Sequence, residues 1–145
     1  MREILFKGKR KDNGEWVYGD LLTVSANNYA SIVEQKSIAL NYEVDLKTIG
    51  QYTGLTDNNG KKIFVNDVLE IISKISIWDD DIFDYAIVER TDLAIVLDDE
   101  KTGGYRLKVY HKGNYKRISK FSFNHLIYYK AKVVGNMYDN PELIK

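Results

Sequence analysis

Short apolar runs separated by turn signals constrain this chain more than any other feature. The runs recur along all 145 residues, and none approaches the ~18 residues that a membrane-spanning helix needs. Asn-Gly and Asp-Asn clusters between them favour the positive φ values of tight turns. The pattern predicts eight or nine short strands in a mainly β fold, a small barrel or roll and not a sheet of βαβ units.

The first strands are predicted in the segment Glu3–Ser25, with a tight turn at the Asp-Asn-Gly of residues 12–14. Trp16 and Tyr18 are expected on one face of the second strand. A bulge or bend is predicted at Gly19-Asp20. Farther on, residues 31–33 and 37–40 read as short strands, although a helix over residues 30–40 remains an alternative.

The segment Asp57-Asn58-Asn59-Gly60 lies between two strand-like runs, and Asn66-Asp67 breaks the second run. A calcium loop of the EF-hand type would need Gly at its sixth position and an acid at its twelfth, where this chain has Lys62 and Val68. A phosphate-binding loop would need a helix to follow, but a strand pattern follows. We therefore interpret Asp57, Asn59 and Gly60, with Asn66 and Asp67, as structural turn residues.

Charge is segregated in the second half of the chain. Residues 79–100 carry nine acids and one base, and residues 101–132 carry nine bases and no acid. Within the acidic segment, residues 85–88 and 93–97 read as two strands. The second segment alternates apolar and polar residues as a strand does, so Tyr105, Leu107 and Val109 are expected to share one face. The candidate binding residues of this basic-aromatic segment are Tyr105, Arg106, Lys108, Tyr110, Lys116 and Arg117.

These basic and aromatic residues permit three interpretations. Cations that meet phosphates, beside tyrosines that stack on bases, would make a nucleic-acid interface. Acidic and basic strands that are neighbours would instead neutralise each other across the sheet. The same segregation would also join two copies of the chain. Because the formal net charge is zero, neutralisation and self-association together are favoured over nucleic acid.

The residues offer little for catalysis or metal binding. The chain has no cysteine, so disulfides, thiolate zinc sites and thiol nucleophiles are excluded. Its two histidines, His111 and His125, form no spacing motif, and no H-E-x-x-H or G-x-S-x-G sequence is present. The acids of residues 79–84 are expected to form a solvated loop, with acid-base catalysis by them as the alternative. We expect no catalytic residue, no metal and no cofactor.

Three blocks of the sequence resemble the YopX family, small proteins of phages and prophages of Gram-positive bacteria whose function is uncharacterised. The blocks are "EVDLKTIGQYTGLTDNNGKKIFVNDVLEI" at residues 43–71, "FKGKRKDNGEWVYGDLL" at 6–22 and "VVGNMYDNPELIK" at 133–145. The chain departs from the family pattern at Val65-Asn66-Asp67, where Glu-Gly-Asp is usual, and at Leu46, where Pro is usual. Residues 73–125 match poorly, so binding specificity is expected there.

The resemblance implies an SH3-like barrel over residues 55–145, with an N-terminal β region of residues 1–54 packed on it. It implies no catalytic residue. We expect a cytoplasmic phage or prophage accessory protein of the host bacterial cell that acts as a non-enzymatic binding or assembly module, with a homo-oligomer as one possible form. The alternative is a nucleic-acid-binding small barrel that uses residues 101–132. No membrane association is expected.

Overall fold

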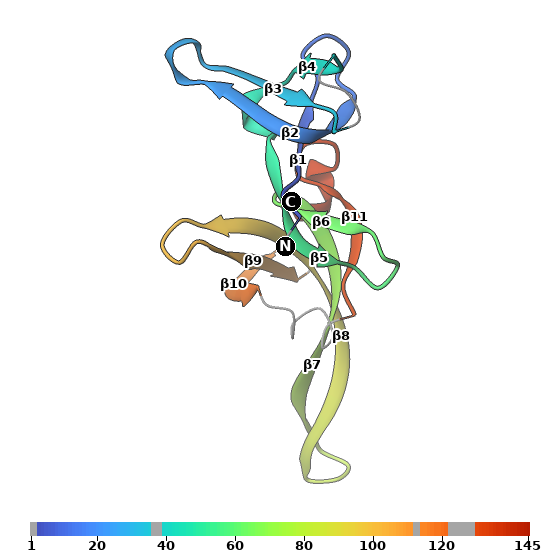
Figure 1. Ribbon diagram of the computed structural model, residues 1–145. Coiled ribbons are helices and arrows are strands. Elements are labelled where there is room, and N and C mark those ends of the chain that lie inside the picture. Colours follow the sequence, from blue (N-terminus) through green and yellow to red (C-terminus); the bar gives the residue numbers. More distant parts are fainter. Residues whose placement is uncertain (1–2, 36–38, 112–113, 122–129) are drawn as a thin grey trace. The chain divides into compact units, whose positions relative to one another are not determined.

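The protein is mainly β, as predicted. The computed structural model describes residues 3–35, 39–111, 114–121 and 130–145, and the side chains of Ser25, Ser73 and residues 114–121 lie outside that description. Its strands form two antiparallel sheets, one of six strands and one of five (Figure 1). Within these ranges the helical residues form three short 3-10 turns, η1 Ser25–Asn27, η2 Leu46–Thr48 and η3 Pro141–Ile144. No helix in the described ranges is long and apolar enough to cross a membrane.

Contacts within the chain define two compact units, and each is described by itself. Unit 1 consists of residues 1–55 and 62–65, and unit 2 consists of residues 56–61 and 66–145. The boundary expected between residues 54 and 55 falls inside the strand Gly50–Thr56. Residues 56–61 connect two strands of unit 1, but they belong by their contacts to unit 2.

Unit 1 holds the six-stranded sheet, in the order β4-β3-β2-β1-β5-β6. Its core is a cluster of Val17, Ala30, Ile32 and Val44, and Leu5, Tyr52 and Phe64 form a second cluster. The bounds are β1 Phe6–Lys9, β2 Trp16–Val24, β3 Tyr29–Val33, β4 Asn41–Glu43, β5 Gly50–Thr56 and β6 Lys62–Phe64.

The predicted first hairpin is present, and so is the strand predicted at residues 31–33. Gly14 has a φ of +73° in the turn between β1 and β2, which is why glycine suits that position. The strand predicted at residues 37–40 is not seen where the structure can be described: Ala39 and Leu40 are outside any strand, and residues 37–38 are not described.

Of the bulge or bend predicted at Gly19-Asp20, the bulge is not seen, because β2 continues through both residues without a register shift. β2 changes its partner there instead: Gly19 pairs with Phe6 of β1, and Asp20 pairs with Val33 of β3. A Cβ atom on Gly19 would lie 2.0 Å from the Val33 carbonyl oxygen. Glycine is therefore required by close backbone approach, and not by a kink.

Unit 2 holds the five-stranded sheet, in the order β10-β9-β8-β7-β11. Its fully buried apolar side chains include Leu69 and Ile71 on β7, Val96 on β8, and Leu107 and Val109 on β9. The bounds are β7 Asp67–Asp79, β8 Asp84–Asp99, β9 Gly104–His111, β10 Asn114–Phe121 and β11 Lys132–Asn136.

The unit 2 sheet is open and is not the closed barrel that the family resemblance implied. Its two outer strands, β10 and β11, do not pair with each other in the described part of the chain. The strands predicted at residues 85–88 and 93–97 are one strand, β8, which pairs with β7 over the whole of Val68–Asp79. Two strands this long reach past their neighbours, which leaves part of the sheet two strands wide.

Candidate binding surface

The two-stranded part of the unit 2 sheet is a long antiparallel ribbon, which we call the ribbon and define as residues 71–92. Residues 71–79 of β7 pair with residues 84–92 of β8. The other partners of these strands contact different residues: β11 pairs with β7 only over residues 67–70, and β9 pairs with β8 only over residues 93–99. In Figure 1 the ribbon extends beyond the other strands of its sheet.

Large apolar side chains are exposed at the end of the ribbon. Phe83, in the turn, is 81% exposed, and Ile87 is 71% exposed. Apolar residues in strands normally pack on one covered face, so a group of them in solvent marks an interaction surface. We call this group the ribbon end; it comprises Ile77, Trp78, Ile82, Phe83, Tyr85 and Ile87.

Local contacts order the ribbon end. Trp78 and Tyr85 are cross-strand partners whose rings meet edge to face, with centroids 5.4 Å apart. The Trp78 indole Nε1 donates a hydrogen bond of 2.8 Å to Asp80 Oδ1, and the Asp81 backbone amide donates one of 2.9 Å to Asp79 Oδ1. Phe83 has a φ of +51°. The exposed aromatic rings are thus held by a defined turn, although this segment was expected to be a solvated loop.

The ribbon is also acidic, with six acids and two bases among residues 71–92. The basic strand β9 pairs only with the other end of β8, residues 93–99, so it does not lie beside most of the ribbon. There Asp98 and Asp99 pair with Tyr105 and Gly104 of β9. A hydrogen bond from Thr102, with the charge of Arg106 as a further cause, lowers the pKa of Asp99.

The predicted basic-aromatic residues of β9 alternate between two faces of the sheet. Leu107 and Val109 are buried, each with 1% exposure, while Arg106, Lys108 and Tyr110 are partly exposed on the other face. Lys108 Nζ lies 5.5 Å from the centroid of the Tyr110 ring. Tyr105 follows the alternation of the buried set but is itself partly exposed.

Lys116 and Arg117 lie on β10, the outer strand beside β9. The register between β9 and β10 shifts between Tyr115 and Arg117, so Lys116 falls within the irregularity. Beyond it, Ile118 is the register partner of Lys108, and Lys120 is the register partner of Arg106. In this register Lys120 lies opposite Arg106, whereas Arg117 lies opposite the buried Val109, so the predicted basic residues of β9 and β10 do not form one set.

A mostly apolar cavity of about 320 Å³ opens on unit 2. Its floor is a row of register partners across three strands, Glu70 on β7, Leu93 on β8 and Tyr110 on β9. Because Lys108 lies two residues before Tyr110 on β9, it flanks this cavity on the same face. The lining residues are Glu70, Thr91, Asp92, Leu93, Tyr110, Val134 and Leu143.

The comparison with protein families assigns the chain. The family model described as YopX protein matches residues 5–145. The chain belongs to the YopX family. A search of the curated proteins finds no match. The resemblance seen in three separate blocks of the sequence is thus confirmed over nearly the whole chain.

In this YopX-family protein, residues 57–60 form the turn that connects β5 to β6. Asp57 Oδ1 accepts hydrogen bonds from the backbone amides of Asn59 and Lys61 at 2.8 and 2.9 Å, and its Oδ2 accepts one from Val133 at 2.9 Å. Burial raises the pKa of Asp57, but these three backbone donors more than offset it and hold the pKa below its ordinary value. Gly60 has a φ of +79°.

The second predicted turn pair, Asn66 and Asp67, leads into β7. Asn66 has a φ of +72°, which asparagine tolerates. Its amide donates to the Val96 carbonyl at 2.8 Å, and its carbonyl accepts from the Met137 amide at 3.0 Å. Asp67 is 3% exposed. In this structure Asn66 adopts the left-handed conformation at the position where the family usually has glycine.

A buried carboxylate on β8 was missed by the sequence reasoning. The Asp92 side chain has no exposure, and its Oδ2 accepts hydrogen bonds from Arg90 Nε and Nη2 at 3.1 and 2.8 Å. Asp92 Oδ1 lies 2.7 Å from His111 Nδ1. Asp92 lies on the buried face of the sheet, where its register partner on β7 is the buried Ile71. His111 lies 19 residues away in sequence, so only the register of β8 with β9 brings the two together.

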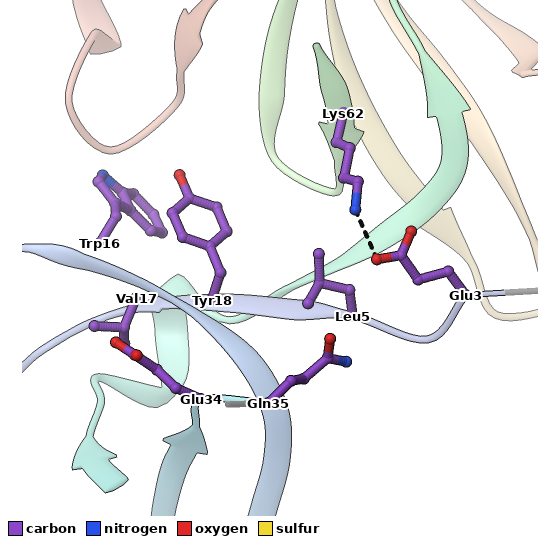
Figure 2. Close-up of a pocket in the computed structure, with 8 residues that line it drawn as sticks. All are labelled: Glu3, Leu5, Trp16, Val17, Tyr18, Glu34, Gln35 and Lys62. Carbon is purple, nitrogen blue, oxygen red and sulfur yellow. Dashed lines mark hydrogen bonds and ion pairs between the residues drawn. The ribbon is translucent and has the colours of Figure 1, made fainter. Parts of the chain in front are cut away.

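Unit 1 carries a shallow hollow of about 400 Å³. Figure 2 shows Trp16 and Tyr18 on the same side of β2, as predicted, with Leu5 between them and the Lys62–Glu3 ion pair. Lys62 Nζ and Glu3 Oε1 are 2.6 Å apart. The Trp16 ring is covered by the chain's own lysine, because Lys7 Nζ lies 4.7 Å from its centroid. The Lys62 charge and the Trp16 ring, which a ligand could otherwise contact, already interact with Glu3 and Lys7 within unit 1.

No group of three or more histidines, aspartates or glutamates that could hold a metal ion occurs in the ranges that the structure describes. His125, one of the two histidines considered at first, lies outside those ranges. The acids at residues 79, 80 and 84 instead accept local hydrogen bonds at the ribbon end. The ribbon end is therefore the best candidate for a binding surface, because its large apolar side chains are exposed to water.

Proposed function

We propose that this YopX-family protein is a non-catalytic binding and assembly module that contacts a protein partner through the ribbon end. The carrying observation is the group of large apolar side chains exposed there, led by Phe83 at 81% and Ile87 at 71%. Trp and Tyr rings supply much of the energy of protein interfaces because they bury large areas at a small entropic cost.

The surrounding charges select the kind of partner. The aspartates at residues 79, 80, 81 and 84 lie in the same turn and strand ends as the apolar side chains. A partner would match them with an apolar groove edged by lysine or arginine, since complementary charge steers association and rejects wrong partners. The cytoplasm of a bacterium that carries a phage or prophage is the proposed setting. A chain without cysteine suits that reducing compartment.

The test places a photocrosslinking amino acid, benzoylphenylalanine, at residue 83 of the full chain in the bacterium. The matched control carries the same group at residue 4, because Ile4 is 61% exposed on unit 1. We expect a discrete protein adduct from residue 83 and none from residue 4. Adducts that are equally frequent at both positions, or absent at residue 83, would overturn the proposal.

The alternative use of residues 101–132 as a nucleic-acid interface has one supporting observation. Arg106, Lys108 and Tyr110 are partly exposed on one face of β9. The acidic ribbon belongs to the same unit, and its charge opposes phosphates. We expect labelled random DNA and RNA to show no saturable anisotropy change at low salt. Saturable binding whose log K falls steeply against log salt would instead favour this alternative.

A further inference from the structure

We infer that the ribbon end of one copy docks into the apolar cavity of unit 2 in a second copy. The inference rests on the proposed function, because it gives the partner of the same surface. Three observations on unit 2 support it. The ribbon end is apolar and exposed, a separate cavity has apolar walls, and a continuous strand holds the two apart.

The cavity suits the ribbon end in size and polarity. Its volume of about 320 Å³ falls in the range of pockets that hold small organic groups. Leu93, Tyr110, Val134 and Leu143 give it apolar walls. Phe83 is the most exposed of the large apolar residues that the structure describes, and it lies in the turn between β7 and β8. An aromatic ring that leaves water for such walls supplies the favourable term for docking.

Charge matches on the two sides of this contact. The segment that forms the ribbon end contains aspartates, and Lys108 on β9 lies two residues from Tyr110, on the sheet face that lines the cavity. On the opposite side, Lys132 of β11 is the register partner of Glu70 and is exposed. Docking would therefore place the acids of one copy against bases of the other. The formal net charge of zero is consistent with a chain whose two charged surfaces complement each other.

One chain cannot make this contact with itself. Leu93, in the floor of the cavity, and Ile87, in the ribbon end, belong to the same uninterrupted strand β8. A strand advances roughly 3.3 Å per residue, so six residues hold the two about 20 Å apart. The strand would have to fold back on itself to close the contact. A second copy is the partner that supplies this cavity without any change in the fold.

The ribbon end and the cavity are different surfaces, so the contact between two copies is heterologous. Each copy keeps one free surface after it docks, and assembly continues until a ring closes or a filament grows. We therefore expect the wild-type chain of 16.8 kDa to exceed dimer mass as its concentration rises. Salt should weaken the assembly, because exposed charges at the rim are screened.

The experiment mixes two defective variants of the full chain and measures mass by sedimentation velocity from about 1 to about 100 μM, a range that covers contacts of micromolar strength. The ribbon variant is Ile82→Asn with Phe83→Asn; both positions are exposed, and asparagine tolerates the φ of residue 83. The cavity variant is Lys108→Glu with Leu143→Glu. The control is Lys101→Glu with Leu46→Glu, which changes the same residue types at exposed positions that belong neither to the ribbon end nor to the cavity lining.

Each defective variant should remain monomeric, the control should assemble like the wild type, and the mixture should form a 1:1 dimer and nothing larger. The dimer arises because only one compatible pair of surfaces remains. Circular dichroism and thermal unfolding first establish that both variants are folded. A cavity variant that self-associates would show that ribbon ends meet each other, and it would overturn the inference, as would a mixture that stays monomeric.

The failure of this inference differs from the failure of the proposed function. A monomeric wild-type chain with a residue 83 adduct to another protein would overturn the second copy as partner and keep the binding function. A monomeric chain with no adduct at residue 83 would overturn both. An adduct between two copies, together with the 1:1 mixture, would support both.

Discussion

The carboxylate of Asp57 accepts a hydrogen bond of 2.9 Å from the backbone amide of Val133, a residue 76 positions later in the chain. The same turn receives a second backbone contact nearby, because the Asn58 amide donates to the Ala131 carbonyl at 3.1 Å. These bonds attach the short segment 56–61 to unit 2, although β5 and β6 on either side of it belong mainly to unit 1. Asp57 is therefore a structural residue with long-range partners.

Replacement of Asp57 by alanine should lower the free energy of unfolding by about 2–3 kcal/mol, since it removes three charge-assisted hydrogen bonds and leaves a buried amide on Val133 without its acceptor. Urea denaturation followed by circular dichroism measures the change. The control is Asp12→Ala, an exposed acid in an ion pair with Arg10, which should change the midpoint little. Equal shifts for the two variants would contradict the structural role.

The stabilisation from Asp57 should disappear in acid. Its pKa in the folded protein is held below the ordinary value of 3.8, so the folded state favours the charged form. The advantage of the wild type over Asp57→Ala is therefore complete above pH ~4 and declines as the pH falls through the ordinary value toward the lowered one. Urea midpoints of both proteins from pH 7 to pH 2.5, about the reach of common buffers, should converge at the acid end. A constant difference would refute this explanation.

Replacement of Asp92 by asparagine should cost roughly 2–3 kcal/mol, because it leaves the Arg90 guanidinium and His111 beside a neutral amide. The cost stays below that of a fully buried pair because Arg90 and His111 are 26% and 24% exposed. Thermal unfolding at neutral pH tests it.

The matched control for Asp92→Asn is Asp98→Asn on the same strand. Burial, with the charge of Glu100 as a second cause, raises the pKa of Asp98. Its charged form is therefore disfavoured in the folded state, and its neutral replacement should cost nothing at neutral pH. A loss of stability at Asp98 as large as at Asp92 would show that the local network is not responsible.

Gly19→Ala should destabilise unit 1 by about 3 kcal/mol or more, since the new methyl group would meet the Val33 carbonyl at 2.0 Å and β2 and β3 would have to separate. Gly104→Ala is the comparison, because a Cβ atom there would lie no closer than 3.6 Å to Thr102. Hydrogen exchange of the β2 and β3 amides shows whether the damage is local. Full protection in Gly19→Ala would contradict the close approach.

Local signals in the sequence were sufficient for the fold class and for the turns. Gly14, Gly60 and Asn66 have positive φ values at the positions where the sequence predicted turns. Such signals act over a few residues, so they can be read without knowledge of the partner strands. Alternation was equally reliable on β9, where Leu107 and Val109 are both buried.

The missed features depend on register and strand length. Polar residues at 89–92 suggested a break between two strands, but Asp92 is buried by its pairing with Arg90 and His111, so β8 continues. The pairing of Asp92 with His111 cannot be inferred from a separation of 19 residues. The exposed ribbon end was missed for the opposite reason: Trp78 and Phe83 have the composition of core residues, and only the length of β7 and β8 places them in solvent.

The position of β11 in the sheet also sets an order of events during synthesis. β11 is translated after every other strand described here, yet it lies beside β7, and Val133 within it supplies the donor that Asp57 accepts. A chain emerging from the ribosome therefore exposes the edge of β7, and Asp57 lacks its Val133 donor, until residues 132–136 appear. β11 covers this edge last. A nascent chain stalled before residue 132 would therefore be open to strand pairing between its exposed β7 edge and other chains.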